Sequence, residues 1–271
     1  MMPAEGLDVY VCPQCKSKLD SRGTALVCPV CQHANPIVDG IPDFLVDDPE
    51  RSSDPVLRSV GRIDRMARFY ESKWWYPLVL NVYGGWHCTT LAKLVDILRE
   101  IVEPVQGLIL DVACGPGTYG RRVASENNII YGIDISLGML RQGVVYATQE
   151  KIANIHFSRN RVESLPFADQ LFDAAICSGS LHLFPNPVQA LREINRVLKT
   201  AAPLAVMTFT PGDKGLFKHA WARKRVQARG FHLFSLPEME RLLVESGFVD
   251  FQPKTFGSVL TFGACKHATD H

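Results

Sequence analysis

Four cysteines near the start of the chain have the residue type and spacing of a metal site. Cys12 and Cys15 form one Cys-x-x-Cys pair, and Cys28 and Cys31 form a second pair twelve residues further on. Each such turn brings two thiolates within reach of one zinc ion, and two turns complete a tetrahedron. With all four positions filled by protein, zinc would have a structural role. The alternatives are two redox pairs or free thiols.

A glycine-rich loop is the second feature that could do chemistry. Gly115, Gly117 and Gly120 match G-x-G-x-x-G, which alone would suggest NAD or FAD. Asp111 ends the preceding apolar run, where a carboxylate would repel a pyrophosphate but attract the ammonium and sulfonium of S-adenosylmethionine. Asp134, 23 residues later, suits the ribose hydroxyls of either cofactor. Asp111 therefore favours S-adenosylmethionine, and Asp134 does not discriminate.

Alternating strand and helix signals must position these residues from about residue 106 onward, which predicts a mostly parallel sheet covered by helices. Two helices have clear starts, at Asn186 before Pro187 and at the capping box of Ser235 and Glu238. The segments predicted as strands are Leu108–Val112, Ile129–Ile133, Ile155–Phe157, Ala174–Ser178, Leu204–Phe209, Val249–Pro253 and Ser258–Ala264.

Composition narrows the class of protein. The chain has 271 residues, of which 46% are hydrophobic and 21% charged, as in globular proteins. Twenty-nine Lys and Arg nearly balance 28 Asp and Glu, which argues against gripping nucleic acid by bulk charge. No run is long enough for a membrane span, and residues 1–10 do not resemble a signal peptide. We therefore expect a reducing, cytoplasmic location, and cysteines present as thiols or metal ligands.

We expect three regions: a zinc-ribbon domain at 1–50, a helical lid or cap at 51–105, and a cofactor-binding core at 106–271. The first region is too small to fold alone without a metal. The segment from Asn35 to Leu45, with the cysteines, resembles the small zinc-ribbon family that activates methyltransferases. This resemblance covers residues 10 to 46 and implies a surface that contacts a methyltransferase, here within the same chain.

Further motifs follow the glycine loop in a recognisable order. They are the segment from Glu163 to Asp173 with its Leu-Pro-Phe, the run from Ser178 to Phe184, and Arg196-Val-Leu-Lys199. As a set they resemble class I S-adenosylmethionine-dependent methyltransferases of the ubiquinone/menaquinone and sterol group, over residues 64 to 266. The resemblance implies an α/β fold, with a Rossmann-like, seven-stranded, mostly parallel sheet, helices on both faces and the ribbon appended.

The resemblance also implies roles for individual positions. Asp111, Gly115 and Gly117 would hold the methionine end of the cofactor, beside Ala113, which replaces a glycine of the family. The other residues expected to border the cofactor are Tyr70, Asp134, Ile135, Met139, Val162, Glu163, Ser178 and Leu181. His182, directly after the fourth strand of the core, is the candidate general base, although a histidine there also commonly packs.

Two departures from the family pattern concern the cofactor site. Arg161 stands where the family has an acidic contact to adenine, and Thr200-Ala-Ala replaces Pro-Gly-Gly. They motivate one alternative function, a non-catalytic zinc-ribbon scaffold with a vestigial cofactor site.

Aromatic residues between 69 and 86 suit a pocket for a greasy substrate or the ordinary packing of a cap. Basic runs at 58–68 and 214–229 suit RNA, anionic lipid or an acidic substrate, or a solvated face. The favoured hypothesis is methyl transfer to a small, apolar acceptor such as an isoprenoid, quinone, sterol-like compound or polyketide. The second is base methylation of rRNA or tRNA, which the near-neutral charge disfavours.

Overall fold

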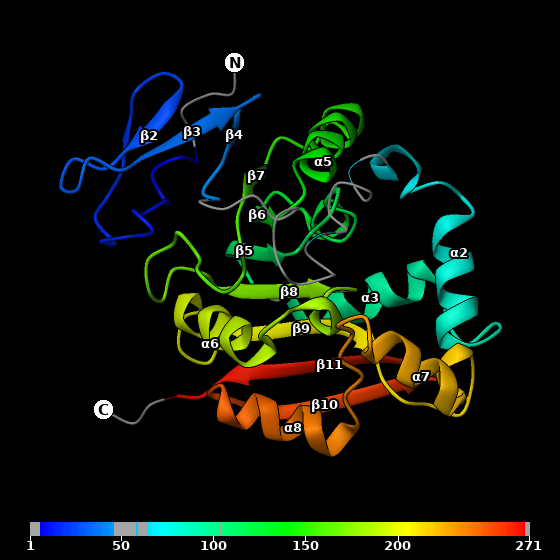
Figure 1. Ribbon diagram of the computed structural model, residues 1–271. Helices are drawn as coiled ribbons and strands as arrows, with labels where there is room; N and C mark the ends of the chain where they lie inside the picture. The colour runs from blue at the N-terminus through cyan, green and yellow to red at the C-terminus, as the bar shows by residue number, and fades with distance from the viewer. Residues whose placement is uncertain (1–5, 46–57, 59–63, 65, 103–104, 269–271) are drawn as a thin grey trace.

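The computed structural model describes residues 6–45, 58, 64, 66–102 and 105–268 (Figure 1). Its first residues form a small antiparallel sheet with the strand order β1-β2-β3-β4. The bounds of these strands are β1 (Asp20–Ser21), β2 (Ala25–Val27), β3 (Ala34–Val38) and β4 (Ile41–Pro42). This sheet carries the cysteine pairs at its loops, as the predicted zinc ribbon requires.

A seven-stranded sheet with the order β10-β11-β9-β8-β5-β6-β7 forms the core. Only β11 runs against its neighbours, so the predicted mostly parallel sheet is confirmed. The strands are β5 (Gly107–Val112), β6 (Asn128–Asp134), β7 (Ile155–Arg159), β8 (Ala174–Ser178), β9 (Pro203–Phe209), β10 (Phe248–Phe256) and β11 (Val259–Lys266). All seven segments read from the sequence lie within or overlap these strands.

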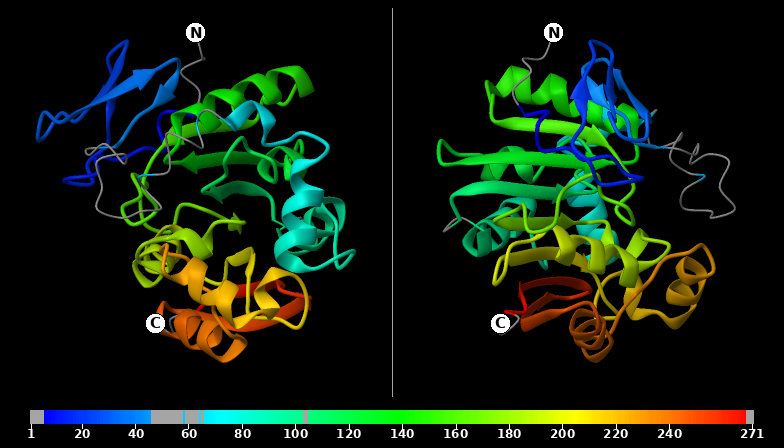
Figure 2. Two further views of the ribbon diagram at one scale, coloured as in Figure 1. Left: turned by 45° about the vertical axis from the view of Figure 1, so that its right-hand side comes forward. Right: turned by 90° about the vertical axis from the view of Figure 1, so that its left-hand side faces the viewer.

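Helices cover both faces of this sheet (Figure 2). On one face, side chains of α3, α4 and α5 bury Ile109 and Ile176, and on the other face α6, α8 and the ribbon bury Leu110 and Cys177. The alternation of neighbouring residues between the two faces is that of a strand covered on both sides. The helices are α3 (Leu91–Val102), α4 (Gly120–Val123), α5 (Leu137–Glu150), α6 (Pro187–Val197), α7 (Ala220–Gln227) and α8 (Leu236–Glu245).

The predicted helix starts have local hydrogen bonds that explain them. The Asn186 side chain accepts from the Gln189 backbone N–H, and Pro187 occupies the first turn of α6. Ser235 and Glu238 form the capping box of α8. Gly247 follows the same helix at φ +84°, a conformation that glycine adopts without strain.

Short helices between ribbon and core form a cap over the carboxyl ends of β5, β6 and β8. They are η3 (Ala67–Phe69), α2 (Trp75–Val79) and the π-helical η4 (Leu80–Gly84). Part of the predicted lid, including Arg62 and Arg65, lies outside the described residues. Among the helices that are described, none has the length and apolar character to cross a bilayer.

Candidate active site and metal centre

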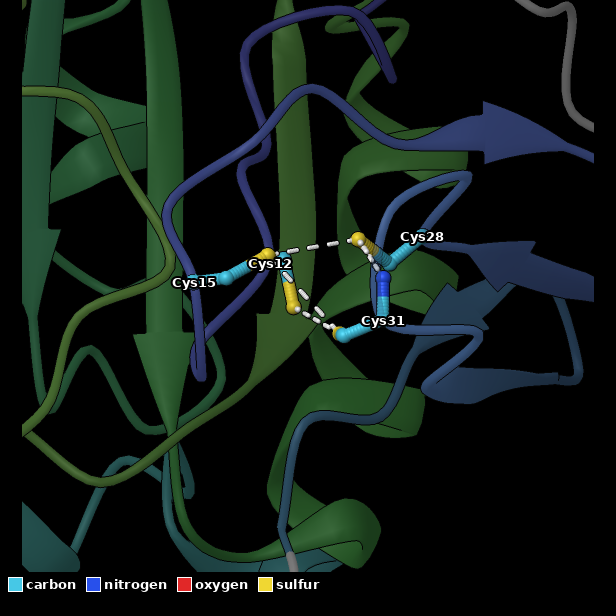
Figure 3. Close-up of side chains that lie close together, drawn as sticks. All are labelled: Cys12, Cys15, Cys28 and Cys31. Carbon is cyan, nitrogen blue, oxygen red and sulfur yellow. Dashed lines mark hydrogen bonds between the residues drawn. The ribbon is translucent and has the colours of Figure 1, made fainter.

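The four ribbon cysteines converge in space (Figure 3). Their sulfur atoms all lie within 4.8 Å of one another. The Cys12–Cys31, Cys15–Cys28 and Cys15–Cys31 sulfur pairs are 3.5, 3.4 and 3.7 Å apart. A tetrahedron with zinc–sulfur bonds of about 2.3 Å has sulfur–sulfur edges of roughly 3.8 Å, so the cluster has the dimensions of a zinc site.

Backbone turns at each cysteine pair create this geometry. Lys16 and Gln32 follow the two pairs in the left-handed region, with φ of +59° and +61°. Their N–H groups donate to the carbonyls of Cys12 and Cys28, at 2.9 and 3.0 Å. Two equivalent turns thus present four thiols to one point, and zinc at this site is structural because the protein supplies all four ligands.

The ribbon is docked on the core through aromatic and ionic contacts. Tyr10 is buried between Phe44 and Phe167, with ring centroids 5.1 and 5.2 Å away. Asp43 forms an ion pair with Arg159 of β7 at 3.1 Å. The Phe44 N–H also donates to the Arg159 carbonyl at 2.9 Å, so the end of the ribbon pairs with the edge of the core sheet.

The glycine loop is held by two carboxylates at the ends of β5 and β6. Asp111 accepts from the Gly120 N–H at 2.9 Å, and Asp134 accepts from the Gly115 N–H at 2.8 Å. Gly115 and Gly117 have φ of +56° and +74°, and a β-carbon on Gly117 would lie 2.9 Å from Phe157. Glycine is therefore required at Gly117 both by its backbone conformation and by the close approach of the ring.

A cavity of about 380 Å³ opens between this loop and the cap. Its lining is mostly apolar and comes from the ends of β5, β6 and β8 and from the cap. The residues are Met66, Tyr70, Trp75, Tyr76, Ala113, Cys114, Gly115, Thr118, Tyr119, Ile133, Asp134, Ile135, Ser136, Met139, Asn160, Arg161, Val162, Glu163, Ser178, Gly179, Ser180, Leu183, Phe184 and Pro185. Open α/β sheets bind ligands at this edge, where the strand order reverses.

The lining contains buried polar atoms to which a ligand could form hydrogen bonds. The Asn160 side-chain oxygen and the hydroxyls of Ser178 and Tyr119 are buried without a hydrogen-bond partner of good geometry among the described residues. Buried polar groups are ordinarily satisfied, so these atoms indicate that a polar molecule completes the site. The lining therefore fits a ligand with an apolar ring and several hydrogen-bonding groups, as S-adenosylmethionine has.

Two buried carboxyl groups give the site a preference for a positively charged ligand. Burial raises the pKa of Asp134 to about 6 and the pKa of Asp111 to about 7, against backbone hydrogen bonds that lower both. Mutual repulsion between the two carboxyls contributes to the higher value at Asp111. A cation nearby would favour the ionised forms, so the pair is suited to a positively charged ligand.

Nine of the residues expected to border the cofactor line this one cavity: Tyr70, Ala113, Gly115, Asp134, Ile135, Met139, Val162, Glu163 and Ser178. Asp111 supports the loop from β5, Gly117 of the loop faces Phe157, and Leu181 is buried in the core. Arg161, the departure at the adenine contact, also lines the cavity and pairs with Glu163 at 3.6 Å. The contact of each residue with the cofactor stays a prediction.

His182 does not reach the cavity. Its ring is buried against Phe209 and Phe231, and Nδ1 lies 3.2 Å from the Thr208 hydroxyl. Burial lowers its pKa to about 3, so the imidazole is neutral. This geometry does not favour the predicted role of His182 as general base; it favours the packing role.

The cap contributes residues that the sequence did not single out. Trp75 and Tyr76 line the cavity beside Tyr70, with ring centroids 5.0 and 6.0 Å from that of Tyr70. Glu71 pairs with the buried Arg121 of α4 and so fastens the cap to the glycine loop. The aromatic density was visible in the sequence, but the rings that face inward could not be distinguished from those that face outward.

Comparisons with known proteins agree with this geometry. Residues 109–201 match the model of a methyltransferase domain, and residues 7–40 match that of Trm112p-like proteins. An uncharacterised chloroplastic methyltransferase of Arabidopsis thaliana is 23% identical over 97% of this chain and 79% of its own. A demethylmenaquinone methyltransferase of Renibacterium salmoninarum is 33% identical over 48% of this chain, which spans 54% of that protein.

Solved structures share the fold. The [4+2]-cyclase SpnF has a TM-score of 0.63 at 21% identity, covering 80% of this chain and 98% of its own. A phosphoethanolamine N-methyltransferase of Haemonchus contortus, in complex with S-adenosyl-L-methionine, has a TM-score of 0.58 at 16% identity, covering 75% and 60%.

The matched methyltransferase domain, the methyltransferase relatives and the shared fold together support the classification of this protein as an S-adenosylmethionine-dependent methyltransferase. It is one whose N-terminus carries a Trm112p-like zinc ribbon in the same chain.

Proposed function

We propose that the enzyme transfers a methyl group in line to a small, largely apolar acceptor of the quinone or isoprenoid type. The observation that carries this proposal is the position of the cavity, which lies beneath the aromatic residues of the cap. Trp75, Tyr76, Leu183 and Phe184 contribute apolar walls to this cavity. Curated relatives from several bacteria are named demethylmenaquinone methyltransferases, which supports an aromatic acceptor.

The residues of the site divide into two groups in this proposal. Asp134, Ile135, Met139 and the backbone at Val162 hold the nucleoside part of the cofactor, and Gly115 approaches its methionine part. Bound S-adenosylmethionine supplies an electrophilic methyl group, so the protein needs mainly to orient the acceptor and exclude water.

The hydroxyls near the acceptor would act as hydrogen-bond donors. Burial raises the pKa of Tyr70 to about 12 and that of Tyr119 further, so both phenols stay protonated. Tyr119 and Ser178 have unused hydrogen-bonding capacity in the lining and can orient an acceptor oxygen.

Calorimetry with S-adenosylmethionine tests the cofactor half of the proposal. We expect one cofactor per chain, with affinity lost in Asp134→Asn. Absence of binding by the zinc-loaded protein would overturn the proposal and favour a vestigial site, as the Arg161–Glu163 pair would allow. Sharing a fold with a cyclase makes this test necessary, because fold alone does not define the reaction.

RNA is the second candidate acceptor, and the basic run around α7 is the observation in its favour. A methyltransferase that acts on RNA should bind bulk RNA with an affinity that falls steeply as salt increases. Methyl transfer to a soluble quinol without such binding would exclude this candidate.

A further inference from the structure

The outward face of the cap carries a row of large apolar side chains. Trp74 caps the start of α2, Leu78 and Val82 lie within α2 and η4, and Trp86 follows the end of η4, so the four residues recur at intervals of four positions. Their exposed fractions are 71%, 60%, 41% and 75%. Exposed apolar residues are usually scattered singly, so a continuous row marks an interaction surface.

The same short segment is apolar on its inner side as well. Trp75 and Tyr76 of α2 line the cavity, while Trp74 and Leu78 face solvent. A helix with apolar residues on both sides is expected to have apolar surroundings on both sides. The core covers the inner side. On the outer side the Lys73 ammonium lies 5.1 Å from the centroid of the Trp74 ring, and Trp74 and Leu78 remain exposed.

A second segment extends this surface. Phe217 of η6 (Leu216–Lys218) packs against Tyr83 of η4, with ring centroids 5.3 Å apart, so α7 lies beside the cap (Figures 1 and 2). Trp221 of α7 is 62% exposed. We call the row of Trp74, Leu78, Val82 and Trp86, together with Trp221, the aromatic face.

The aromatic face lies on two segments that contain cations and no acidic residue, one between Glu71 and Asp96 and the other between Asp213 and Glu238. From Ser72 to Val95 the cations are Lys73 and Lys93, and from Lys214 to Pro237 they are Lys214, Lys218, Arg223, Lys224, Arg225 and Arg229; neither segment contains Asp or Glu. In a chain with 29 cationic and 28 acidic residues, this is a strong local excess.

Most of these cationic side chains are exposed to solvent and accessible to a binding partner. Lys214, Lys218, Lys224, Arg225 and Arg229 are exposed. Arg223 differs because it donates to the carbonyls of Phe217 and Lys218, at 2.8 and 2.9 Å, and so stabilises the turn before α7. Lys224 and Arg225 stand three and four residues after Trp221 in α7 and share its side of the helix.

We propose that the aromatic face docks on an anionic phospholipid bilayer. Tryptophan favours the boundary between headgroups and acyl chains, and Lys and Arg bind anionic headgroups. Leu78 and Val82, in the middle of the row, have no ring on which a base could stack, so the row suits hydrocarbon better than single-stranded RNA. The charge around it matches an anionic surface.

Docking would place the roof of the cavity against the bilayer. Because Trp74 at the start of α2 faces solvent and Trp75 of α2 faces the cavity, an acceptor dissolved in the membrane would enter the cavity past this one helix. This delivery role rests on the proposed function, whereas binding to the bilayer does not.

The test measures binding to vesicles of phosphatidylglycerol and phosphatidylcholine, with pure phosphatidylcholine as the neutral reference. We expect wild type to bind the anionic vesicles, more weakly as salt increases. Trp74→Ser with Trp86→Ser, and separately Lys224→Glu with Arg225→Glu, should each weaken binding by at least about tenfold. Unchanged calorimetry with S-adenosylmethionine would show that both double variants are folded.

Control variants carry comparable changes elsewhere. Val145→Ser with Val244→Ser removes two apolar side chains that are 45% and 64% exposed, and Arg22→Glu with Lys151→Glu repeats the charge reversal. Both controls should bind vesicles as wild type does.

Three results would overturn the proposal: no binding to anionic vesicles, equal losses in the control variants, or binding to single-stranded RNA instead of vesicles. Vesicle binding by a protein that does not methylate apolar acceptors would overturn only the proposed function. Methylation of a soluble quinol by a protein that does not bind vesicles would overturn only the proposal that the aromatic face docks on a bilayer.

Discussion

The zinc ribbon and the cavity are built in opposite ways. The ribbon gathers its four ligands from twenty consecutive positions, Cys12 to Cys31, on two equivalent turns. The cavity takes its lining from positions between Met66 and Pro185, on α2, β6, α5 and β8 and on the loops that follow β5, β7 and β8. A metal site with local ligands forms when short turns form, whereas the cavity exists only when the sheet, the glycine loop and the cap are assembled together.

The two regions are nevertheless coupled through β7. Arg159 pairs with Asp43 of the ribbon on one side, and its Nε donates to the Ile135 carbonyl, beside the cavity, at 2.9 Å on the other. Changes in either region therefore test whether the ribbon is an appendage or a support of the site.

The largest effect is expected from removing one zinc ligand. In Cys28→Ser the ribbon should lose zinc and unfold, since structural zinc contributes about 10 kcal/mol or more to such domains. The free energy of unfolding of the core should also fall by roughly 2 kcal/mol or more, because Tyr10 would leave its buried site. Zinc analysis and thermal unfolding measure the two effects.

Cys265→Ser is the control, because this half-buried thiol lies outside the cluster. An unchanged unfolding midpoint of the core in Cys28→Ser would show that the ribbon is a mere appendage.

Asp134→Asn should have the next largest effect, and it should be confined to the cavity. The carboxylate accepts from the N–H groups of Gly115 and Ser136, at 2.8 Å each, and an amide can accept only through its oxygen. We expect affinity for S-adenosylmethionine to fall by about a hundredfold, near 2.7 kcal/mol, with zinc content unchanged. Asp169→Asn, at an exposed position, is the matched control.

Glu71→Gln tests the fastening of the cap. The Arg121 side chain is fully buried, Glu71 is 12% exposed, and Glu150 supplies a second, 45% exposed partner. Because Glu150 still pairs with Arg121, we expect the free energy of unfolding to fall by about 1–2 kcal/mol rather than by the full penalty of a broken buried pair. Calorimetry should show weaker cofactor binding in Glu71→Gln than in Glu150→Gln. Equal losses of affinity would show that the contact between cap and glycine loop does not support the cofactor site.

The pH dependence of cofactor binding follows from the raised pKa of Asp134. Since that pKa is about 6 in the free protein, protonation should weaken binding of a ligand that favours the carboxylate as pH falls through 6. The loss of affinity from Asp134 between pH 8 and pH 5 should be about tenfold, and the total loss should be smaller in Asp134→Asn, where only Asp111, with its pKa of about 7, still titrates in this range.

The stability of the unliganded protein should follow the reverse course. Its folded-state pKa for Asp134 is above the unfolded value of 3.8, so the free energy of unfolding should decrease as pH rises from 4 through 6. Zinc content must be measured at each pH, because protonation of thiolates also releases the metal.

Ala113→Gly should have the smallest effect, and it should be favourable. Ala113 adopts φ of +50°, a conformation that costs a residue with a β-carbon about 1–2 kcal/mol of stability. Glycine would relieve this strain, but its greater conformational freedom in the unfolded state would offset part of the gain. We expect a net gain below about 1 kcal/mol with unchanged cofactor affinity. Ala205→Gly, at a fully buried strand position, should destabilise instead.

The sequence was a reliable guide where the signal is local. The strands of the core, the caps at Asn186 and Ser235, and the ribbon cysteines follow from periodicity, capping residues and spacing. Most of the loop and strand-end residues placed around the cofactor by resemblance also line the cavity, because the carboxyl ends of neighbouring parallel strands meet at one edge.

Side-chain direction was harder to read. Trp74 and Trp75 are adjacent in sequence, yet one faces solvent and the other the cavity, and only the packed cap distinguishes them. His182 follows β8 at the expected edge, but its ring turns toward Thr208 and away from the cavity. The Glu71–Arg121 contact joins residues far apart in sequence, and no local pattern announces it.

The most direct test of the account is transfer of a labelled methyl group from S-adenosylmethionine by the zinc-loaded protein. The assay offers a quinol with an isoprenoid tail and bulk RNA side by side. The account predicts label in the quinol alone, lost in Asp134→Asn and retained in the control Asp169→Asn. Label in RNA, or no transfer by a protein that binds the cofactor, would contradict it.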